Sequence, residues 1–440
     1  MAQPVEIPSD PTAAVEAQVE VPPELVAQTL GEYARAWWAR VRAGDSGILP
    51  VVAGLILIMI VFEIISPNHV FLHADNLVNL FQQSAVFMVL AMAEIFALLL
   101  GEIDLSIGYV GACGGVIAVQ LVQPVTTNWP WWAAMLAALA FCFAVGAIQG
   151  TIITRVGIPS FIVTLAGFLI FNGVMLILLL FGPFSGYPNL TGEGDNLKVL
   201  FNLMAGTIDP TLSWVLMAII VLGIGAVMWF ADQRRRRSGL VAPPASLTLI
   251  KIGVIAAAGA VVVAISDVNR ANVGTLAGVP WVVPIVLVVL GAWTILLERT
   301  KYGRYVYAIG GNPEAARRAG INVPMVRTLA FALCSMTAGV GGMLYASYIG
   351  GMSNNVEGGQ LVLFAVAGAV IGGTSLFGGR GKAIHGVLGG LVIGGIYNGL
   401  YLLSADVQRI FIVTGLVLLA AVSIDALSRR ASGAGAAGRR

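Results

Sequence analysis

Long apolar stretches recur along this chain, and they constrain its fold more than any other feature. A helix needs about 20 apolar residues to cross the ~30 Å hydrocarbon core of a membrane. About twelve stretches meet this need: residues 48–66, 77–100, 104–123, 131–153, 160–182, 212–231, 247–266, 279–297, 325–349, 361–377, 384–403 and 407–426. With 58% hydrophobic and only 10% charged residues, the chain is far more apolar than a water-soluble domain. The sequence predicts an all-α, polytopic integral membrane helical bundle of about twelve transmembrane helices.

Two pairs of these stretches follow each other with almost no polar interruption. One helix from Ala85 to Val122 would be about 57 Å long at 1.5 Å per residue, which exceeds a single crossing. We therefore expect the chain to turn near residues 101–106, and likewise in the glycine-rich segment 372–381. Small residues at four-residue spacing, such as Gly386, Gly390 and Gly394, predict close packing between helices.

The basic residues indicate the orientation, because cytoplasmic loops retain Lys and Arg. If the N-terminus is cytoplasmic and the spans alternate, 21 of the 24 basic residues fall inside, and only Lys198, Arg270 and Arg409 fall outside. Residues 1–45 lack the basic start and apolar core of a signal peptide. We expect a cytoplasmic extension over 1–45, a transmembrane domain over 46–427 and a cytoplasmic tail over 428–440.

Several function classes are excluded by the motifs. The segment 378–382 resembles a phosphate loop, but Leu376 and Ala383 break the required spacing. The sequence contains neither a His-Glu-x-x-His motif nor a Gly-x-Ser-x-Gly motif. Cys113, Cys142 and Cys334 lie in apolar stretches without paired spacing, so we expect buried thiols and no metal site. A net charge of +2 gives no reason to expect nucleic acid. We expect a protein that is not an enzyme and holds no cofactor.

Acidic residues within the apolar stretches are the first candidates for function, because they are costly in a membrane. Glu94, Glu102, Asp104 and the adjacent Ser106 lie close together in sequence. Two interpretations stay open: a polar pathway or gate for a hydroxyl-rich solute, or carboxylates that hold the broken segment by capping amides or pairing with a basic residue. Weaker candidates for the pathway are Gln149, Asn172 and Asn398, for which interhelical hydrogen bonding is the alternative.

The cytoplasmic segment 298–323 contains a compact helix design. Asn312 can cap the free N–H groups, Pro313 suits the first helical position and Gly320 can close the C-terminus. So short a helix is marginal alone in water, which leaves packing on its own subunit or on a partner open. The residues of this predicted helix are Asn312, Pro313, Glu314, Ala315, Ala316, Arg317, Arg318 and Gly320.

Three sequence blocks carry a family resemblance. Residues 303–317 read Gly-Arg-Tyr-Val-Tyr-Ala-Ile-Gly-Gly-Asn-Pro-Glu-Ala-Ala-Arg, residues 101–106 read Gly-Glu-Ile-Asp-Leu-Ser, and residues 371–381 read Ile-Gly-Gly-Thr-Ser-Leu-Phe-Gly-Gly-Arg-Gly. Together they resemble the permease subunits of bacterial ATP-binding-cassette (ABC) importers for simple sugars, over about residues 48–427. Most of that family has Gly-Gly-Ile-Asp-Leu-Ser, and the Glu form resembles the xylose branch. Two spans around residues 234–237, added to the ten-helix family core, also resemble that branch.

The resemblance implies a permease that carries a monosaccharide, expected to be D-xylose, across the bacterial inner membrane. It implies a permease homodimer, a periplasmic sugar-binding protein and a cytoplasmic ABC ATPase subunit that binds the ATP. The helix at 312–320 would then be the ATPase coupling helix. An ion-coupled secondary sugar transporter is the alternative, in which Glu94 and Asp104 would carry protons. A membrane-embedded enzyme would need a nucleophile or a metal cluster, which the motifs do not provide.

Overall fold

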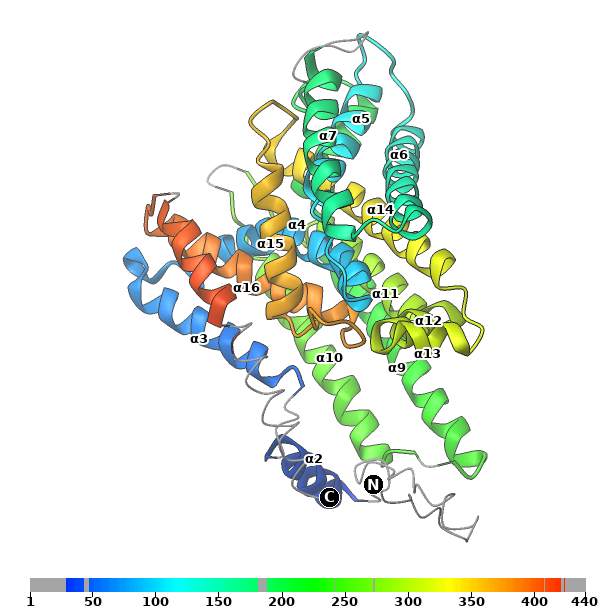
Figure 1. Ribbon diagram of the computed structural model, residues 1–440. Coiled ribbons are helices and arrows are strands. Elements are labelled where there is room, and N and C mark those ends of the chain that lie inside the picture. Colours follow the sequence, from blue (N-terminus) through cyan, green and yellow to red (C-terminus); the bar gives the residue numbers. More distant parts are fainter. Residues whose placement is uncertain are drawn as a thin grey trace, which may run out of the picture. The chain divides into compact units, whose positions relative to one another are not determined.

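The computed structural model describes residues 29–42, 47–180, 188–240, 242–271, 274–406, 408–420 and 423. Over these residues the regular secondary structure is helical, apart from two isolated β-bridges, Asn189 with Gly351 and Thr207 with Pro280, and loops and turns join the helices (Figure 1). The labelled helices are α2 (Leu30–Arg42), α3 (Leu49–Ile65), η1 (Pro67–His69), α4 (Ala74–Leu99), α5 (Ile107–Leu121), α6 (Trp131–Thr151), η2 (Ile152–Val156), α7 (Ser160–Leu180), α8 (Asp195–Ala205), α9 (Pro210–Arg237), α10 (Ala245–Ser266), α11 (Val282–Arg299), α12 (Lys301–Gly311), α13 (Pro313–Arg318), α14 (Val323–Ile349), α15 (Gly358–Ile371) and α16 (Ala383–Leu402).

The helices confirm the predicted fold class. Among the described residues, eight helices are long and apolar enough to cross a membrane: α4, α6 continued by η2, α7, α9, α10, α11, α14 and α16. Four shorter apolar helices, α3, α5, α15 and Gln408–Ala420, occupy the other four predicted spans. Both predicted turns are present, since α4 ends at Leu99 before α5 begins at Ile107, and α15 ends at Ile371 before α16 begins at Ala383. Gly101 adopts the left-handed φ of +76° in the first turn.

The described chain divides into two compact units. The smaller unit holds α2 and the segment Val215–Val261, which includes most of α9 and α10. There the Thr248 hydroxyl donates to Asp232 Oδ2 at 2.8 Å, and Gly225 lies against Ile252. This unit contains most of the two spans around residues 234–237 that were predicted in addition to a ten-helix core. The predicted tail 428–440 and residues 1–28 of the extension lie outside the described residues.

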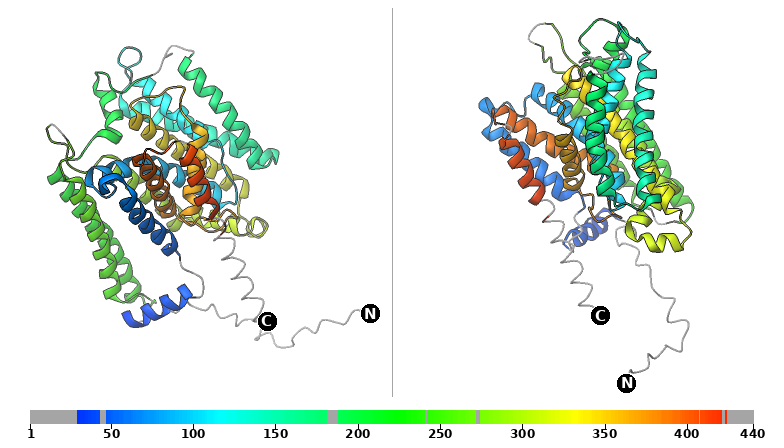
Figure 2. Two further views of the ribbon diagram at one scale, coloured as in Figure 1. Left: turned by 90° about the vertical axis from the view of Figure 1, so that its left-hand side faces the viewer. Right: turned by 45° about the horizontal axis from the view of Figure 1, so that its top comes forward.

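The larger unit is built around α4, which is almost wholly buried. It packs against α14, α15 and α16, and Figures 1 and 2 show these four helices gathered together. The predicted glycine ridge on α16 explains part of this packing. A Cβ atom added at Gly390 would lie 2.5 Å from the backbone nitrogen of Met88, and Gly386 and Gly394 face α4 in the same way. Without side chains at these positions, the two helix backbones approach closely.

Loops that were expected on the same side of the membrane contact one another. The turn containing Gly101 touches the segment containing Phe377 and Gly378, and both are predicted to be cytoplasmic. On the opposite side, the backbone N–H of Leu190 donates to the Gly350 carbonyl at 2.9 Å. These contacts agree with the predicted alternation of the spans, while the absolute orientation stays a prediction.

Candidate functional site

The break between α4 and α5 is held by buried polar side chains. Glu94 Oε1 accepts a hydrogen bond from the backbone N–H of Asp104 at 3.1 Å. Asp104 Oδ1 in turn accepts from the backbone N–H and the hydroxyl of Ser106, at 2.9 and 2.6 Å. The Ser106 hydroxyl also lies 3.0 Å from the side-chain oxygen of Gln149 on α6. Because a hydroxyl carries one proton, turning the Gln149 amide by 180° would let its nitrogen donate to Ser106. The structure therefore brings together four of the seven predicted pathway residues.

Glu102 ties the same break to another helix. Its carboxylate forms an ion pair with the guanidinium of Arg327 on α14, and it is only 9% exposed. The Thr164 hydroxyl on α7 donates to the Ile103 carbonyl at 3.2 Å. These contacts are those that the structural interpretation of the carboxylates requires, namely amide capping and pairing with a basic residue. A role for Glu94, Glu102 and Asp104 in transport stays a prediction.

Two further candidates lie away from the break. Asn172 is half-buried on α7. Asn398 on α16 is buried, and its side-chain nitrogen donates to Gln83 Oε1 at 3.2 Å while its oxygen accepts from Asn76 at 3.0 Å. Gln83 is on α4, about 16 Å from Glu94 at 1.5 Å per residue. Asn398 therefore belongs to a different polar group from the acidic residues.

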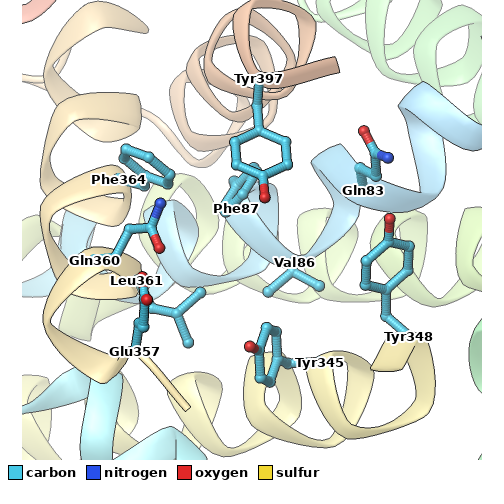
Figure 3. Close-up of a pocket in the computed structure, with 10 residues that line it drawn as sticks. All are labelled: Gln83, Val86, Phe87, Tyr345, Tyr348, Glu357, Gln360, Leu361, Phe364 and Tyr397. Atoms are coloured by element: carbon cyan, nitrogen blue, oxygen red, sulfur yellow. The ribbon is translucent and has the colours of Figure 1, made fainter. Parts of the chain in front are cut away.

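Gln83 lines a pocket that the sequence did not reveal (Figure 3). The pocket measures ≈ 80 Å³ and lies among α4, α14, α15 and α16. Its wall consists of Gln83, Val86, Phe87, Tyr345, Tyr348, Glu357, Gln360, Leu361, Phe364 and Tyr397. Aromatic rings and a few amide, hydroxyl and carboxylate groups thus share one space inside the larger unit.

The aromatic side chains of this pocket hold one another in place. Phe87 meets Phe364 edge-on at 5.3 Å between ring centroids, and both rings contact Tyr397, at 6.0 and 6.4 Å. Such edge-to-face arrangements favour fixed ring positions. The hydroxyl of Tyr348 lies beside the Gln83 amide. The pocket therefore offers rigid apolar ring surfaces next to hydrogen-bonding groups.

A wider opening adjoins this pocket. It measures ≈ 540 Å³, and Glu357 and Gln360 line both spaces. Asn354 and Asn355, in the loop between α14 and α15, add polar side chains to the opening. Because α14 is predicted to run outward, this loop is expected on the periplasmic side. This opening, which we call the polar approach, therefore shares two wall residues with the aromatic pocket.

The predicted cytoplasmic helix is present as α13, with the expected ends. The Asn312 side chain accepts from the backbone N–H of Ala315 at 3.0 Å, Pro313 is the first helical residue, and Gly320 adopts a φ of +81°. Glu314 pairs with Arg317 at 3.4 Å and with Arg318 at 3.2 Å, and all three side chains are exposed. The capping prediction is confirmed, and the coupling role stays a prediction.

Next to α13, the three sequence blocks that carried the resemblance meet through their backbones, since a Cβ atom added at Gly378 would lie 2.8 Å from the Gly310 carbonyl oxygen and 2.9 Å from the Gly101 nitrogen. A Cβ atom added at Gly310 on α12 would overlap the carbonyl oxygen of Leu99, and would lie 2.5 Å from the backbone nitrogen of Gly379. That nitrogen donates to the same Leu99 carbonyl at 2.9 Å. We call this contact of Leu99, Gly310 and Gly379 the glycine junction. It links the C-terminal end of α4 to the segment that carries α13.

Comparison with known proteins decides the family. A family model described as "Branched-chain amino acid transport system / permease component" matches residues 76–422. The chain belongs to this family of transport permeases. The matched residues contain the aromatic pocket, the acidic break and the glycine junction, and they leave α2 and α3 outside.

Three named permeases are similar in sequence to this chain over most of its length. It is 30% identical over 386 residues to the xylose transport system permease protein of Escherichia coli, covering 88% of this chain and 93% of that one. It is 32% identical over 387 residues to the protein of the same name in Haemophilus influenzae, covering 85% and 95%. It is also 30% identical over 378 residues to the ribose import permease protein of E. coli, covering 85% and 92%. These relatives confirm the resemblance, and no solved structure matches.

Proposed function

We propose that this permease is the membrane-spanning subunit of an ABC importer that carries a monosaccharide inward across the bacterial inner membrane. D-xylose is the sugar we propose first, because relatives named for xylose transport align over 93–95% of their length. The relative named for ribose import makes ribose the natural competitor. The observation that carries the proposal is the aromatic pocket with its polar approach.

The chemistry of the pocket suits a sugar. The side-chain amides of Gln83 and Gln360 can donate hydrogen bonds to sugar hydroxyls and accept hydrogen bonds from them, and the Glu357 carboxylate can accept them. The rings of Phe87 and Tyr397 can cover the apolar C–H faces of a pyranose. Binding sites that enclose small molecules usually measure about 300–1,000 Å³, whereas this pocket measures ≈ 80 Å³. The helices around it must therefore separate to admit a sugar, as alternating access requires.

The proposed partners meet the permease at opposite ends. A periplasmic sugar-binding protein would deliver the sugar to the opening near Asn354 and Asn355. A cytoplasmic ATPase subunit would receive α13, whose Glu314, Arg317 and Arg318 are exposed. Both termini would be cytoplasmic, and two permease copies would form the pore. ATP would bind to the ATPase subunit.

Sugar uptake in cells tests this proposal. Labelled xylose uptake is measured in cells that lack this chain, with and without its restoration, and with a proton uncoupler added while ATP is maintained. We expect uptake to return with the chain, to survive the uncoupler and to resist competition by unlabelled ribose. Uptake abolished by the uncoupler would instead indicate a proton-coupled transporter. Strong competition by unlabelled ribose would indicate that ribose, and not xylose, is the transported sugar.

A further inference from the structure

A second, basic pocket lies at the end of the molecule that carries α12. It is an open space of ≈ 500 Å³, and three cationic side chains line it: Arg304 on α12, Arg380 in the turn before α16, and Lys382 directly before α16. All three are exposed. Within the described part of the chain, none of them lies within ion-pair distance of a carboxylate. Glu298 is the acidic residue in the wall, so the pocket carries an excess of positive charge.

The backbone around this basic pocket is fixed by hydrogen bonds. The Tyr307 hydroxyl donates to the Gly381 carbonyl at 2.7 Å, and the backbone N–H of Ser375 donates to the Arg380 carbonyl at 2.9 Å. Burial raises the pKa of Tyr307 to about 12, so its hydroxyl remains a donor at neutral pH. These bonds fix the backbone at Arg380 and Gly381, and Arg380 and Lys382 line the same pocket as Arg304. The backbone of the site therefore needs little reorganisation to receive an anion.

The position of the pocket favours a lipid as the source of that anion. The pocket lies where α11 ends, at Leu297 and Glu298, and where α16 begins. Both helices are long and apolar enough to cross a membrane, so their ends lie at the level of the headgroups. Few residues of α11 are fully buried, and three of its apolar side chains, Leu287, Val288 and Ile295, are exposed, Ile295 to 61% one turn before Glu298. Basic pockets between transmembrane helices on the cytoplasmic side bind phosphate headgroups.

We propose that Arg304, Arg380 and Lys382 form a binding site for the phosphate headgroup of an anionic phospholipid in the cytoplasmic leaflet. This inference takes from the proposed function only the orientation of the chain. The bound lipid would hold the turn before α16 against α12, next to the glycine junction. It would therefore stabilise the region through which α13 is attached to α4.

Lipid binding to the purified, delipidated permease tests the site. Native mass spectrometry measures the binding of phosphatidylglycerol and of phosphatidylcholine to the full chain. We expect phosphatidylglycerol to bind preferentially, and Arg380→Gln/Lys382→Gln to weaken this binding roughly tenfold to thirtyfold, given the usual contribution of each basic residue near an anionic surface. The charge-conserving variant Arg380→Lys/Lys382→Arg should keep most of the binding.

A matched control variant and two further measurements separate a lipid site from the other possible ligands of the basic pocket. Lys198→Gln/Arg409→Gln removes two exposed charges that are predicted on the opposite side of the membrane and should leave phosphatidylglycerol binding within about twofold. An equal loss in this variant, or equal binding of both lipids, would overturn the site. Displacement of the lipid by millimolar inorganic phosphate would identify a free-phosphate site instead. Unchanged lipid binding in Arg380→Gln/Lys382→Gln, with loss of ATPase assembly, would show that the pocket receives the partner protein.

Discussion

At the scale of the residue, the buried acidic side chains of the α4–α5 break are constrained by their contacts. Glu102 is 9% exposed and its partner Arg327 is 31% exposed. Removing one member of such a pair leaves the other charge without its partner in a poorly hydrated place. The pair therefore matters more for stability than an ion pair in open solvent.

The first prediction concerns this pair. Glu102→Gln should lower the stability of the purified permease by about 1.5–3 kcal/mol, the usual value of a hydrogen bond to a charged group. The measurement is thermal unfolding in detergent. The control is Asp406→Asn, which breaks an exposed pair with Arg409 and should have almost no effect. Equal unfolding temperatures for Glu102→Gln and the unchanged protein would contradict the structural role.

Residue type predicted the acidic break but could not predict the aromatic pocket. A carboxylate in an apolar stretch is unusual enough to be noticed in one sequence. The tyrosines of the pocket, Tyr345, Tyr348 and Tyr397, do not stand out in the sequence, because tyrosine near the end of a span is typical of the membrane interface. Only the packing of α4, α14, α15 and α16 brings these tyrosines to Gln83. The three-residue spacing of Tyr345 and Tyr348 could have placed both on one helix face.

At the scale of the element, the glycine junction joins α12 to the C-terminal end of α4. Gly310 and Gly311 are adjacent in sequence, but the first is tightly packed and the second has open space around it. A Cβ atom at Gly310 would overlap the Leu99 carbonyl, whereas one at Gly311 would meet nothing within 4 Å. The pair therefore provides a matched test of the junction.

The second prediction uses this pair. Gly310→Ala should force α12 away from α4, at a cost of about 1–3 kcal/mol for overpacking, and should lower sugar uptake at equal membrane abundance. Gly311→Ala should leave both stability and uptake unchanged. Uptake is measured with labelled xylose and abundance by immunoblotting of membranes. If the two variants behave alike, the junction does not transmit movement.

The third prediction concerns α13. Its charged side chains are exposed, so they contribute little to the stability of the permease alone. Glu314→Ala/Arg317→Ala should therefore stop uptake while the protein remains in the membrane with an unchanged unfolding temperature. Normal uptake in this variant would refute the coupling role of α13.

At the scale of the whole molecule, the predicted spans match the helices because hydropathy and helix length are local properties. The turns before α5 and before α16 were predictable, since no single helix of that length fits a membrane. The separation of residues 215–261 into a second compact unit could not be predicted from the sequence, because it depends on which helices pack together. The choice of sugar likewise depends on which side chains the packing brings together.

The central claim is that the aromatic pocket binds the transported sugar, and Tyr397 tests it most directly. Tyr401 is the matched control, one turn later on α16 and 65% exposed. Labelled xylose uptake is measured at equal membrane abundance, with ATP maintained and the proton gradient removed. Tyr397→Ala should lower uptake roughly tenfold or more through loss of ring contact and hydroxyl. Tyr397→Phe should lower it less, and Tyr401→Ala should leave it unchanged. Full uptake in Tyr397→Ala, or an equal loss in Tyr401→Ala, would contradict the claim.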